Sequence, residues 1–339
     1  MSTATPSTDW REEIPDDEEA RLIRGAELLR DLQRARKGGG KADRALHAKG
    51  IGFSAELTVA ADLPEHARVG PFATPGKRYG AYVRFSNGSG KRGADKRQDI
   101  RGIAVKLLGV EGKKLISGME DETTQDFLAI ATPFTPIRNA DEFVTLVRAA
   151  ETPALLPLKL AWALGLGRTL ELVKALTKKP AVPFTSFATS RFWSALPIQF
   201  GPYAIHFSFV PKAAVSPDAQ LPSTDEALMD DLVTRLKSVR ITYDLQVQYF
   251  VDAQKTPIED PSVEWKESDS AFITVATLVL GKQDASTSEG VKLRELIEAL
   301  SFDPWHAVTE LKPLGNMMRA RSHAYRLSTQ ERGAAKEPR

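Results

Sequence analysis

Arg44-Ala-Leu-His47-Ala-Lys49-Gly50-Ile51-Gly52 runs without a break into Phe53-Ser-Ala-Glu-Leu-Thr-Val59. The second part alternates apolar and polar residues, as a half-buried strand does, and the glycines punctuate the approach to it. We therefore expect His47 at the mouth of a β-strand, three residues after the cation Arg44. An imidazole in this position could move protons, bind a metal ion or make a structural hydrogen bond.

The composition is that of a globular chain with a mixed surface. Of the 339 residues, 42% are hydrophobic and 27% are charged, and the formal net charge is +2. A sizeable core can therefore form, and no nucleic-acid partner is indicated. The chain has no cysteine, which excludes disulfides, thiolate nucleophiles and cysteine-ligated metals and fits a reducing compartment or exposure to oxidants. No secretory signal or membrane span is visible, so we expect a cytoplasmic location.

Helical and strand-like patterns are dispersed through the whole length. Apolar residues recur at helical spacing over residues 16–36, 141–180, 292–300 and 314–326. Strands are predicted for 52–60, 80–86, 103–108, 126–132, 203–210, 241–250 and 272–280. This dispersal predicts an α+β fold, with a large antiparallel β-barrel or strongly curved sheet and with inserted and C-terminal helices. We expect an N-terminal arm and helix over 1–40, one domain over 41–332 and a solvated tail over 333–339.

The most apolar segment of the chain is Ala154-Leu-Leu-Pro-Leu-Lys-Leu-Ala-Trp-Ala-Leu-Gly-Leu166. It is shorter than a membrane span and contains Pro157 and Lys159. We interpret it as a helix that packs on the core or lines a ligand channel. Contact with a membrane surface is the alternative.

A second candidate cluster follows near the C-terminus, in Arg319-Ala-Arg321-Ser-His323-Ala-Tyr325. On a helix, Arg321 and Tyr325 are four residues apart and share a face, and Arg332 is seven residues further on. A guanidinium beside a phenol stabilises the phenolate, the form that ligates a metal ion. The alternative is a solvated basic helix with one tyrosine packed inward.

Four segments together resemble haem catalases. Arg44–Gly50 looks like the family's distal-histidine motif. Val83-Arg84-Phe85-Ser86, followed by Asp99–Lys106, resembles the family's next signature. Phe302-Asp-Pro304, followed by Met318–Tyr325, resembles its proximal, haem-ligating helix. The matches occur in the family's order and cover approximately 40–145 and 300–332. The predicted strands at Tyr243–Gln248 and Val263–Trp265 are similar to strands of the small catalase-related haem peroxidases.

The resemblance implies a catalase-like, haem-binding domain over 41–332 and a role for each matching residue. His47 would be the distal acid–base catalyst, oriented by a hydrogen bond with Ser86. Tyr325 would be the iron ligand of haem b, kept ionised by Arg321. The haem propionates would be held by Arg44, Arg84 and Arg332. Asp99 matches a carboxylate near the peroxide channel, although it could simply pair with Arg101.

One departure concerns the distal pocket. The family's asparagine is missing, because the alignment puts Ile130 and Ala131 in that region, and Thr135-Pro136 replaces a phenylalanine pair. Asn139 lies too far along the chain to be its direct substitute.

The resemblance implies a haem-dependent hydroperoxidase that reduces hydrogen peroxide or organic hydroperoxides through a ferryl intermediate. Its partners would be peroxide and a small-molecule reductant, and catalase turnover would be weak without the asparagine. The alternatives are a lipid-hydroperoxide isomerase or dehydratase on the same scaffold, and a non-enzymatic haem-binding protein. We expect no nucleic-acid partner and no membrane span, and a homo-oligomer is compatible with this reading.

Overall fold

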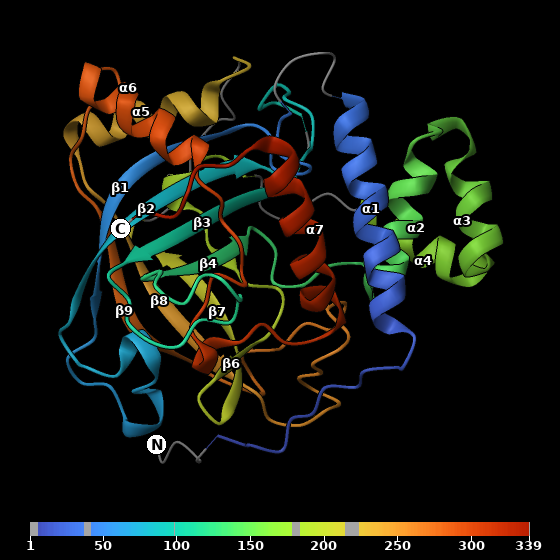
Figure 1. The fold of residues 1–339 in the computed structure, drawn as a ribbon, viewed down its shortest axis with the longest axis horizontal. Coiled ribbons are helices and arrows are strands. Elements are labelled where there is room, and N and C mark those ends of the chain that lie inside the picture. The colour runs from blue at the N-terminus through green and yellow to red at the C-terminus, as the bar shows by residue number, and fades with distance from the viewer. Residues whose placement is uncertain (1–5, 37–41, 98, 178–183, 214–223, 339) are drawn as a thin grey trace.

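The computed structural model describes residues 6–36, 42–97, 99–177, 184–213 and 224–338, and its centre is an antiparallel β-barrel (Figure 1). Within these residues, nine strands are ordered β5-β4-β3-β2-β1-β9-β8-β7-β6, and a further pairing of β5 with β7 closes the ring and leaves β6 outside it. Their bounds are β1 Gly50–Val59, β2 Arg78–Asn87, β3 Arg101–Leu108, β4 Thr124–Ile130, β5 Phe192–Trp193, β6 Ile198–Phe200, β7 Tyr203–Pro211, β8 Ile241–Tyr249 and β9 Phe272–Leu280. The predicted α+β barrel is confirmed.

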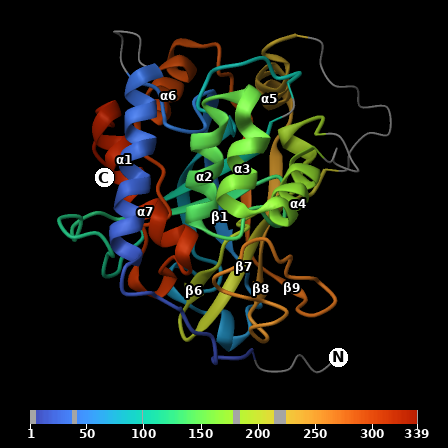
Figure 2. The ribbon, with the colours of Figure 1, turned by 90° about the vertical axis from the view of Figure 1, so that its right-hand side faces the viewer.

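In the part of the chain that the structure describes, seven α-helices pack outside the barrel, and most of them lie on one side of it (Figures 1 and 2). They are α1 Glu18–Arg36, α2 Ala140–Ala150, α3 Leu156–Leu164, α4 Leu166–Thr177, α5 Ala227–Ser238, α6 Ser288–Ala299 and α7 Asn316–Arg332. Single 3₁₀ turns occur at Glu65–Ala67, Gly70–Phe72, Pro153–Leu155, Phe187–Thr189 and Thr309–Leu311. Helix α1 packs along α7, and α2, α3 and α4 form a group that projects beyond α1.

Strand alternation separates the barrel core from a second, outer layer. Successive side chains of a strand point to opposite faces of the sheet. On β2–β4 the odd-numbered residues enter the main apolar core, namely Val83, Phe85, Ile103, Val105 and Phe127. The even-numbered residues of the same strands therefore face outward, under the covering helices.

The segment 154–166 is helical, as predicted, but the prediction that it packs on the main core is wrong. It forms α3 and the start of α4, which meet at Gly165, and it packs with α2 in a separate cluster around Leu160 and Leu172. Several of its other apolar side chains are exposed. Within the described residues, no helix is long and apolar enough to cross a membrane.

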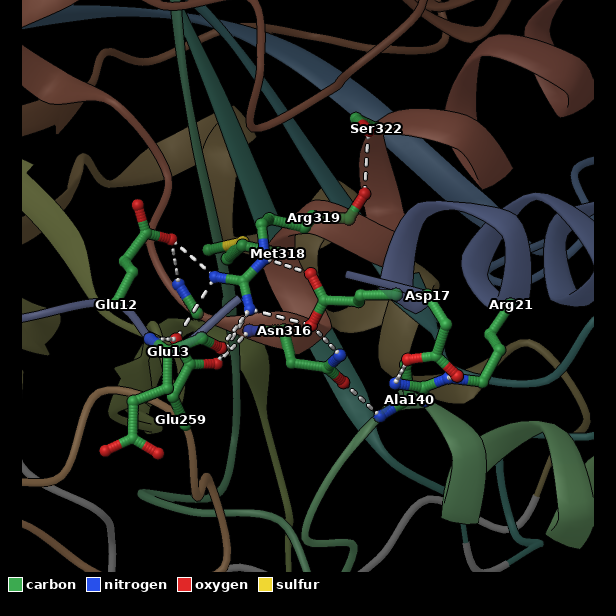
Figure 3. Close-up of polar contacts among 12 residues, drawn as sticks. Glu12, Glu13, Asp17, Arg21, Ala140, Glu259, Asn316, Met318, Arg319 and Ser322 are labelled. Atoms are coloured by element: carbon green, nitrogen blue, oxygen red, sulfur yellow. Dashed lines mark hydrogen bonds and ion pairs between the residues drawn. The ribbon is translucent and has the colours of Figure 1, made fainter. Parts of the chain in front are cut away.

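The N-terminal arm is tied to the first turn of α7 by Arg319 (Figure 3). This guanidinium pairs with Glu12 at 2.6 Å, with Glu18 of α1 at 2.6 Å and with Glu259 at 3.0 Å. In the same turn, Asn316 Oδ1 accepts the backbone N–H of Ala140 at 2.7 Å, at the start of α2. The first turn of α7 thus fixes the positions of both α1 and α2.

We expected the C-terminal tail to be solvated, but its residue Glu337 buries the side-chain carboxylate against Lys106. Lys106 and Asp126 are fully buried on the outer face of β3 and β4, 2.7 Å apart. Glu337 lies 2.5 Å from Lys106 Nζ and accepts from the Thr124 hydroxyl at 2.7 Å. His306 Nδ1 completes the cluster, 3.3 Å from both Asp126 and Glu337. We call the four titratable side chains Lys106, Asp126, His306 and Glu337 the Lys106 cluster.

Candidate active site

A cavity of about 420 Å³ lies between the outer face of β2–β4 and helices α1, α2 and α7. Its volume is within the usual range for a small-molecule or cofactor site. The strands contribute mainly their outward-facing residues, Arg84, Ser86, Gly102, Ala104, Leu128 and Ile130. The cavity also contains every site residue that the sequence predicted: Arg44, His47, Arg84, Ser86, Arg321, Tyr325 and Arg332.

His47 lies in the segment before β1, and its backbone has a conformation that residues other than glycine rarely adopt. Its φ is +57°, in the left-handed region, where a non-glycine backbone is strained. The strain is held by hydrogen bonds on both sides of the residue. His47 N donates to Gly88 O at 3.0 Å, and Arg84 Nη2 donates to His47 O at 3.0 Å. The backbone thus aims the imidazole at Ser86 Oγ, which lies 2.9 Å from Nδ1.

The environment of His47 keeps the imidazole neutral. Burial, followed by the positive charges of Arg84, Arg321 and Arg44, lowers the pKa of His47 from 6.5 to about 3. With Nδ1 engaged by Ser86, the free ring nitrogen is Nε2. At neutral pH this ring can accept a proton, and that proton is then strongly acidic.

Tyr325 and Arg321 lie one turn apart on α7 and both reach the cavity. Arg321 Nη2 donates to Tyr325 Oη at 2.8 Å, and its guanidinium carbon lies 5.0 Å from the centre of the phenol ring. Gly333, with φ +60°, ends the helix directly after Arg332. The residues 317, 321, 325, 328 and 332 therefore form one continuous face along the cavity.

The three arginines of the predicted propionate site converge on the C-terminal end of α6. Arg44 Nη2 donates to Glu298 O at 3.0 Å and to Leu300 O at 2.8 Å. Arg332 donates to Glu298 O at 3.1 Å and to Leu300 O at 2.8 Å. Arg84 pairs with the Glu298 carboxylate through two hydrogen bonds, of 2.9 and 3.1 Å. The helix end and its last carboxylate thus supply part of the negative charge that these cations need.

Positive charge still exceeds negative charge in this cluster. Among the described residues, Glu298 is the acidic residue that pairs with Arg44 and Arg84, so one carboxylate serves these guanidinium groups. Burial and the repulsion from Arg84 and Arg332 hold the pKa of Arg44 well below its usual value. Arg44 Nε is buried and lies 3.6 Å from Glu298 Oε1, and it makes no hydrogen bond to a described residue. A buried donor without a hydrogen bond, beside excess positive charge, fits a ligand with acidic groups.

The cavity wall is apolar at Ile130, one of the positions that take the place of the family's asparagine. Ile130 lines it, in register with Gly102 of β3, which in turn pairs with Ser86 of β2. Asn139 caps α2, where its Oδ1 accepts the N–H of Glu142 at 2.9 Å. It does not contribute to the cavity lining, so this amide is committed elsewhere. Asp99 lines the cavity, accepts from Ser89 N at 3.0 Å and lies 3.8 Å from Arg101 Nη1.

The remaining histidines lie outside the cavity lining. His206 of β7 is buried and stacks on Trp265 with the ring centres 3.9 Å apart. His306 belongs to the Lys106 cluster. The part of the chain that the structure describes contains no group of three or more His, Cys, Asp or Glu residues suited to hold a metal ion.

Sequence reasoning missed Glu298, the Arg21–Asp141 ion pair at the cavity and the contribution of α1 to its lining. Glu298 belongs to a helix with several ordinary charged residues, and no spacing distinguishes it. Arg21 and Asp141 are 120 residues apart and are paired by tertiary structure alone. The amphipathic pattern of α1 predicted a buried face but not what that face covers.

A model of the catalase family matches residues 24–155. Catalase C of Rhizobium meliloti is 38% identical over 71 residues, which are 21% of this chain and 10% of that protein. The catalase of Ascaris suum is also 38% identical over 71 residues, or 21% of this chain and 13% of its own length. The alignments thus cover only about a tenth of these relatives' length.

The solved structures extend the likeness to nearly the whole chain. A bacterial catalase superposes with a TM-score of 0.66 at 18% identity, over 98% of this chain and 63% of that one. A fungal catalase gives a TM-score of 0.66 at 19% identity, over 98% of this chain and 67% of its own. The fold is therefore the catalase fold, on a chain about two thirds as long as these structures. The chain thus resembles haem catalases in two ways: residues 24–155 match the catalase family, and nearly the whole chain has the catalase fold.

Proposed function

We propose that this chain is a haem-dependent hydroperoxidase, most similar to the small catalase-related peroxidases, that reduces hydrogen peroxide or organic hydroperoxides. One observation carries the proposal. The pairs His47–Ser86 and Arg321–Tyr325 come from opposite ends of the sequence and line the same cavity. A neutral buried base and a cation-bound phenol in one pocket match the two halves of a haem peroxidase site.

The residues present fit haem b. Tyr325 Oη would ligate the iron, and Arg321 Nη2 holds this oxygen in place inside the cavity with a hydrogen bond of 2.8 Å. The excess positive charge around Arg44, Arg84 and Arg332, with a buried Arg44 Nε that makes no hydrogen bond to a described residue, suits the two propionates. The apolar residues Ala104, Leu128 and Phe302 line the same cavity and would contact the macrocycle. When bound, haem would supply the metal and the electrons that cleave the peroxide O–O bond.

The protein's own part in the reaction is proton transfer. His47 Nε2 would accept the proton of the peroxide oxygen nearest the iron and return it to the departing oxygen, which leaves as water or an alcohol. Ser86 Oγ would accept from Nδ1–H, which keeps the lone pair on Nε2. The low pKa of His47 serves both steps, because the ring is neutral before transfer and releases the proton readily afterwards.

The distal wall favours the peroxidase reaction over full catalase turnover. Ile130, Leu196 and Val144 present apolar surface to the cavity. Such a wall offers no amide to orient a second hydrogen peroxide molecule, and it accommodates the carbon chain of an organic hydroperoxide. The same apolar wall supports the second candidate, isomerisation or dehydration of a lipid hydroperoxide.

Spectroscopy and product analysis test these assignments together. The haem-supplemented protein should show a Soret band of ferric haem with an oxygen ligand. Oxygen evolution from hydrogen peroxide should be slow relative to oxidation of a chromogenic donor. A fatty-acid hydroperoxide converted without consumption of the donor would favour the isomerase instead. His47→Ala should lower donor oxidation by about 10²–10⁴-fold. An unchanged, negligible rate in this variant would leave only haem binding.

A further inference from the structure

Helices α3 and α4 carry an apolar face that is open to solvent. Trp162 is 91% exposed, and Leu158, Leu166 and Leu170 are 68–74% exposed. Leu158 and Trp162 are four residues apart on α3, and Leu166 and Leu170 are four apart on α4, so each pair shares one helix face. We call these four residues the α3–α4 apolar face. Large apolar side chains exposed in this way on neighbouring helices mark an interaction site.

The opposite face of the same two helices is already buried. Leu160 and Leu172 are fully buried against α2, with Leu156 and Leu164 packed beside them. The exposed residues are therefore not needed to hold the three helices together. Helix α3 is apolar on both sides, a pattern typical of helices with no side in water. Something other than this chain's core is required to cover it.

One lysine beside the face has no counter-ion in the described chain. Lys174 is exposed, continues the four-residue row of Leu166 and Leu170 along α4, and forms no ion pair with a described residue. Lys159 follows Leu158 directly, but it is half-buried and donates to Thr152 Oγ1 at 3.0 Å. The nearby Arg168 is neutralised by Glu142 and Glu171. The face thus combines exposed leucines, an exposed tryptophan and one exposed lysine that has no ion-pair partner in the described chain.

The position of the face suits a flat surface. The α2–α4 group projects from the side of the molecule, with α3 and α4 outermost (Figures 1 and 2). A projecting face can be covered by an extended surface without a complementary groove. Tryptophan and long lysine side chains are enriched where protein meets the headgroup layer of a bilayer. From these observations we propose that the α3–α4 apolar face docks on an anionic phospholipid bilayer, lying in its surface without crossing it.

This docking would bring the bilayer close to one wall of the cavity. Phe143 of α2 packs against the cluster that supports α3 and α4, and it also lines the cavity. Only one helix therefore separates the lipid-facing side chains from the pocket. The proposal stands on the helices' surface alone and is independent of the haem and of the reaction.

Vesicle flotation of the full chain tests the proposal without any activity assay. The protein is mixed with vesicles of phosphatidylcholine, or of phosphatidylcholine with about 30% phosphatidylglycerol, and floated through a density gradient. We expect it to float with the anionic vesicles and less with the neutral ones. The double variant W162S/L166S should lower the bound fraction at least about tenfold, since each large apolar side chain removed costs roughly an order of magnitude in the equilibrium constant.

Trp162→Phe is the matched control, because it keeps the apolar area and changes only the fluorophore. This variant should still float, and the blue shift of tryptophan emission on vesicle addition should disappear. Equal circular dichroism of all variants would show that the fold is intact. Absence of the parent protein from the anionic vesicle fraction would overturn the proposal. It would also be overturned by a dimer in gel filtration that W162S/L166S converts to monomer, because the face would then cover a second copy.

Discussion

Gly102 lies so close to His47 that a Cβ at position 102 would stand 3.0 Å from Cε1 and 3.2 Å from Nδ1 of the imidazole. Ser86, Gly102 and Ile130 form one row across β2, β3 and β4. The absence of a side chain in the middle of this row leaves the space in which the imidazole lies. Because the backbone of His47 is held on both sides, the ring can give way only by leaving Ser86.

Gly102→Ala should therefore lower peroxide turnover by about 10–100-fold, the cost of a displacement on the order of 1 Å in a catalytic group. Haem binding, followed by the Soret band, should persist because Tyr325 is untouched. Gly80→Ala in β2 is the control, since a Cβ there meets only Leu108, at 3.8 Å. Wild-type turnover in Gly102→Ala would mean that the placement of the imidazole against Ser86 does not matter for the reaction.

Ile130→Asn should shift the balance of reactions toward catalase. An amide at position 130 would lie beside Gly102, at the opposite end of the row from Ser86. It could donate a hydrogen bond to a second peroxide, so the ratio of oxygen evolution to donor oxidation should rise by about tenfold, the value of one well-placed hydrogen bond. Ile130→Leu keeps the apolar wall and should leave this ratio unchanged. A lower ratio in the asparagine variant would count against an accessible distal position at residue 130.

Glu298→Gln should destabilise the protein without haem more than the haem-loaded protein. The substitution leaves Arg44, Arg84 and Arg332 without their carboxylate. Arg84 is 4% exposed and Glu298 is 36% exposed, so the loss should be about 2 kcal/mol, below that for a fully buried pair. Bound propionates would restore negative charge and reduce the loss. Urea unfolding of the variant with and without haem measures this loss of stability. Glu56→Gln is the control, because it breaks the exposed pair with Arg78 and should cost under about 0.5 kcal/mol. Equal losses with and without haem would argue against propionates at this cluster.

Two buried histidines should make the fold acid-sensitive. Burial lowers the pKa of His206 to about 3, and burial with nearby cations lowers that of His47 to about 3, from 6.5 in the unfolded chain. Between these pH values the unfolded chain binds more protons, so the free energy of unfolding falls as pH is lowered from about 6.5 toward 3. His206→Phe should retain the stacking on Trp265 and make this fall shallower, by up to about 1.4 kcal/mol per pH unit.

Asp303 should act in the opposite direction over part of the same range. Burial raises its pKa from 3.8 to about 6, so between these values the folded chain binds more protons and gains stability as pH falls. Asp303→Asn should remove this gain and steepen the acid loss. Thermal unfolding between pH 4 and pH 7 compares the three proteins. Parallel pH profiles for all of them would contradict both assignments.

The sequence predicted the candidate site residues best, because they occur in short motifs in a recognisable order. His47, Ser86, Arg321 and Tyr325 were predicted from short motifs, and the structure brings them to one cavity. Seven of the strands were also predicted near their observed positions, because each is long enough for its alternation to be visible. The eighth strand of the barrel, β5, has two residues, Phe192 and Trp193, and so has no period to detect.

Charge partners were hidden for a different reason. The carboxylate that accompanies the three arginines is Glu298, and its identity depends on where the end of α6 meets β2. No local pattern encodes that meeting. The apolar residues of α3 were visible in the sequence, but their side of the helix was assigned to the core, because apolar spacing alone does not distinguish a buried face from an uncovered one.

The Lys106 cluster has a consequence for synthesis of the chain. Lys106 and Glu337 are 231 residues apart, so β3 leaves the ribosome long before its last counter-ion exists. Until then Asp126 alone can neutralise the lysine, and the outer face of β3 and β4 remains uncovered by the tail. The outer face of β3 and β4 therefore carries a docking place for a segment 231 residues further on, and this layer is complete only after residue 337 has been synthesised.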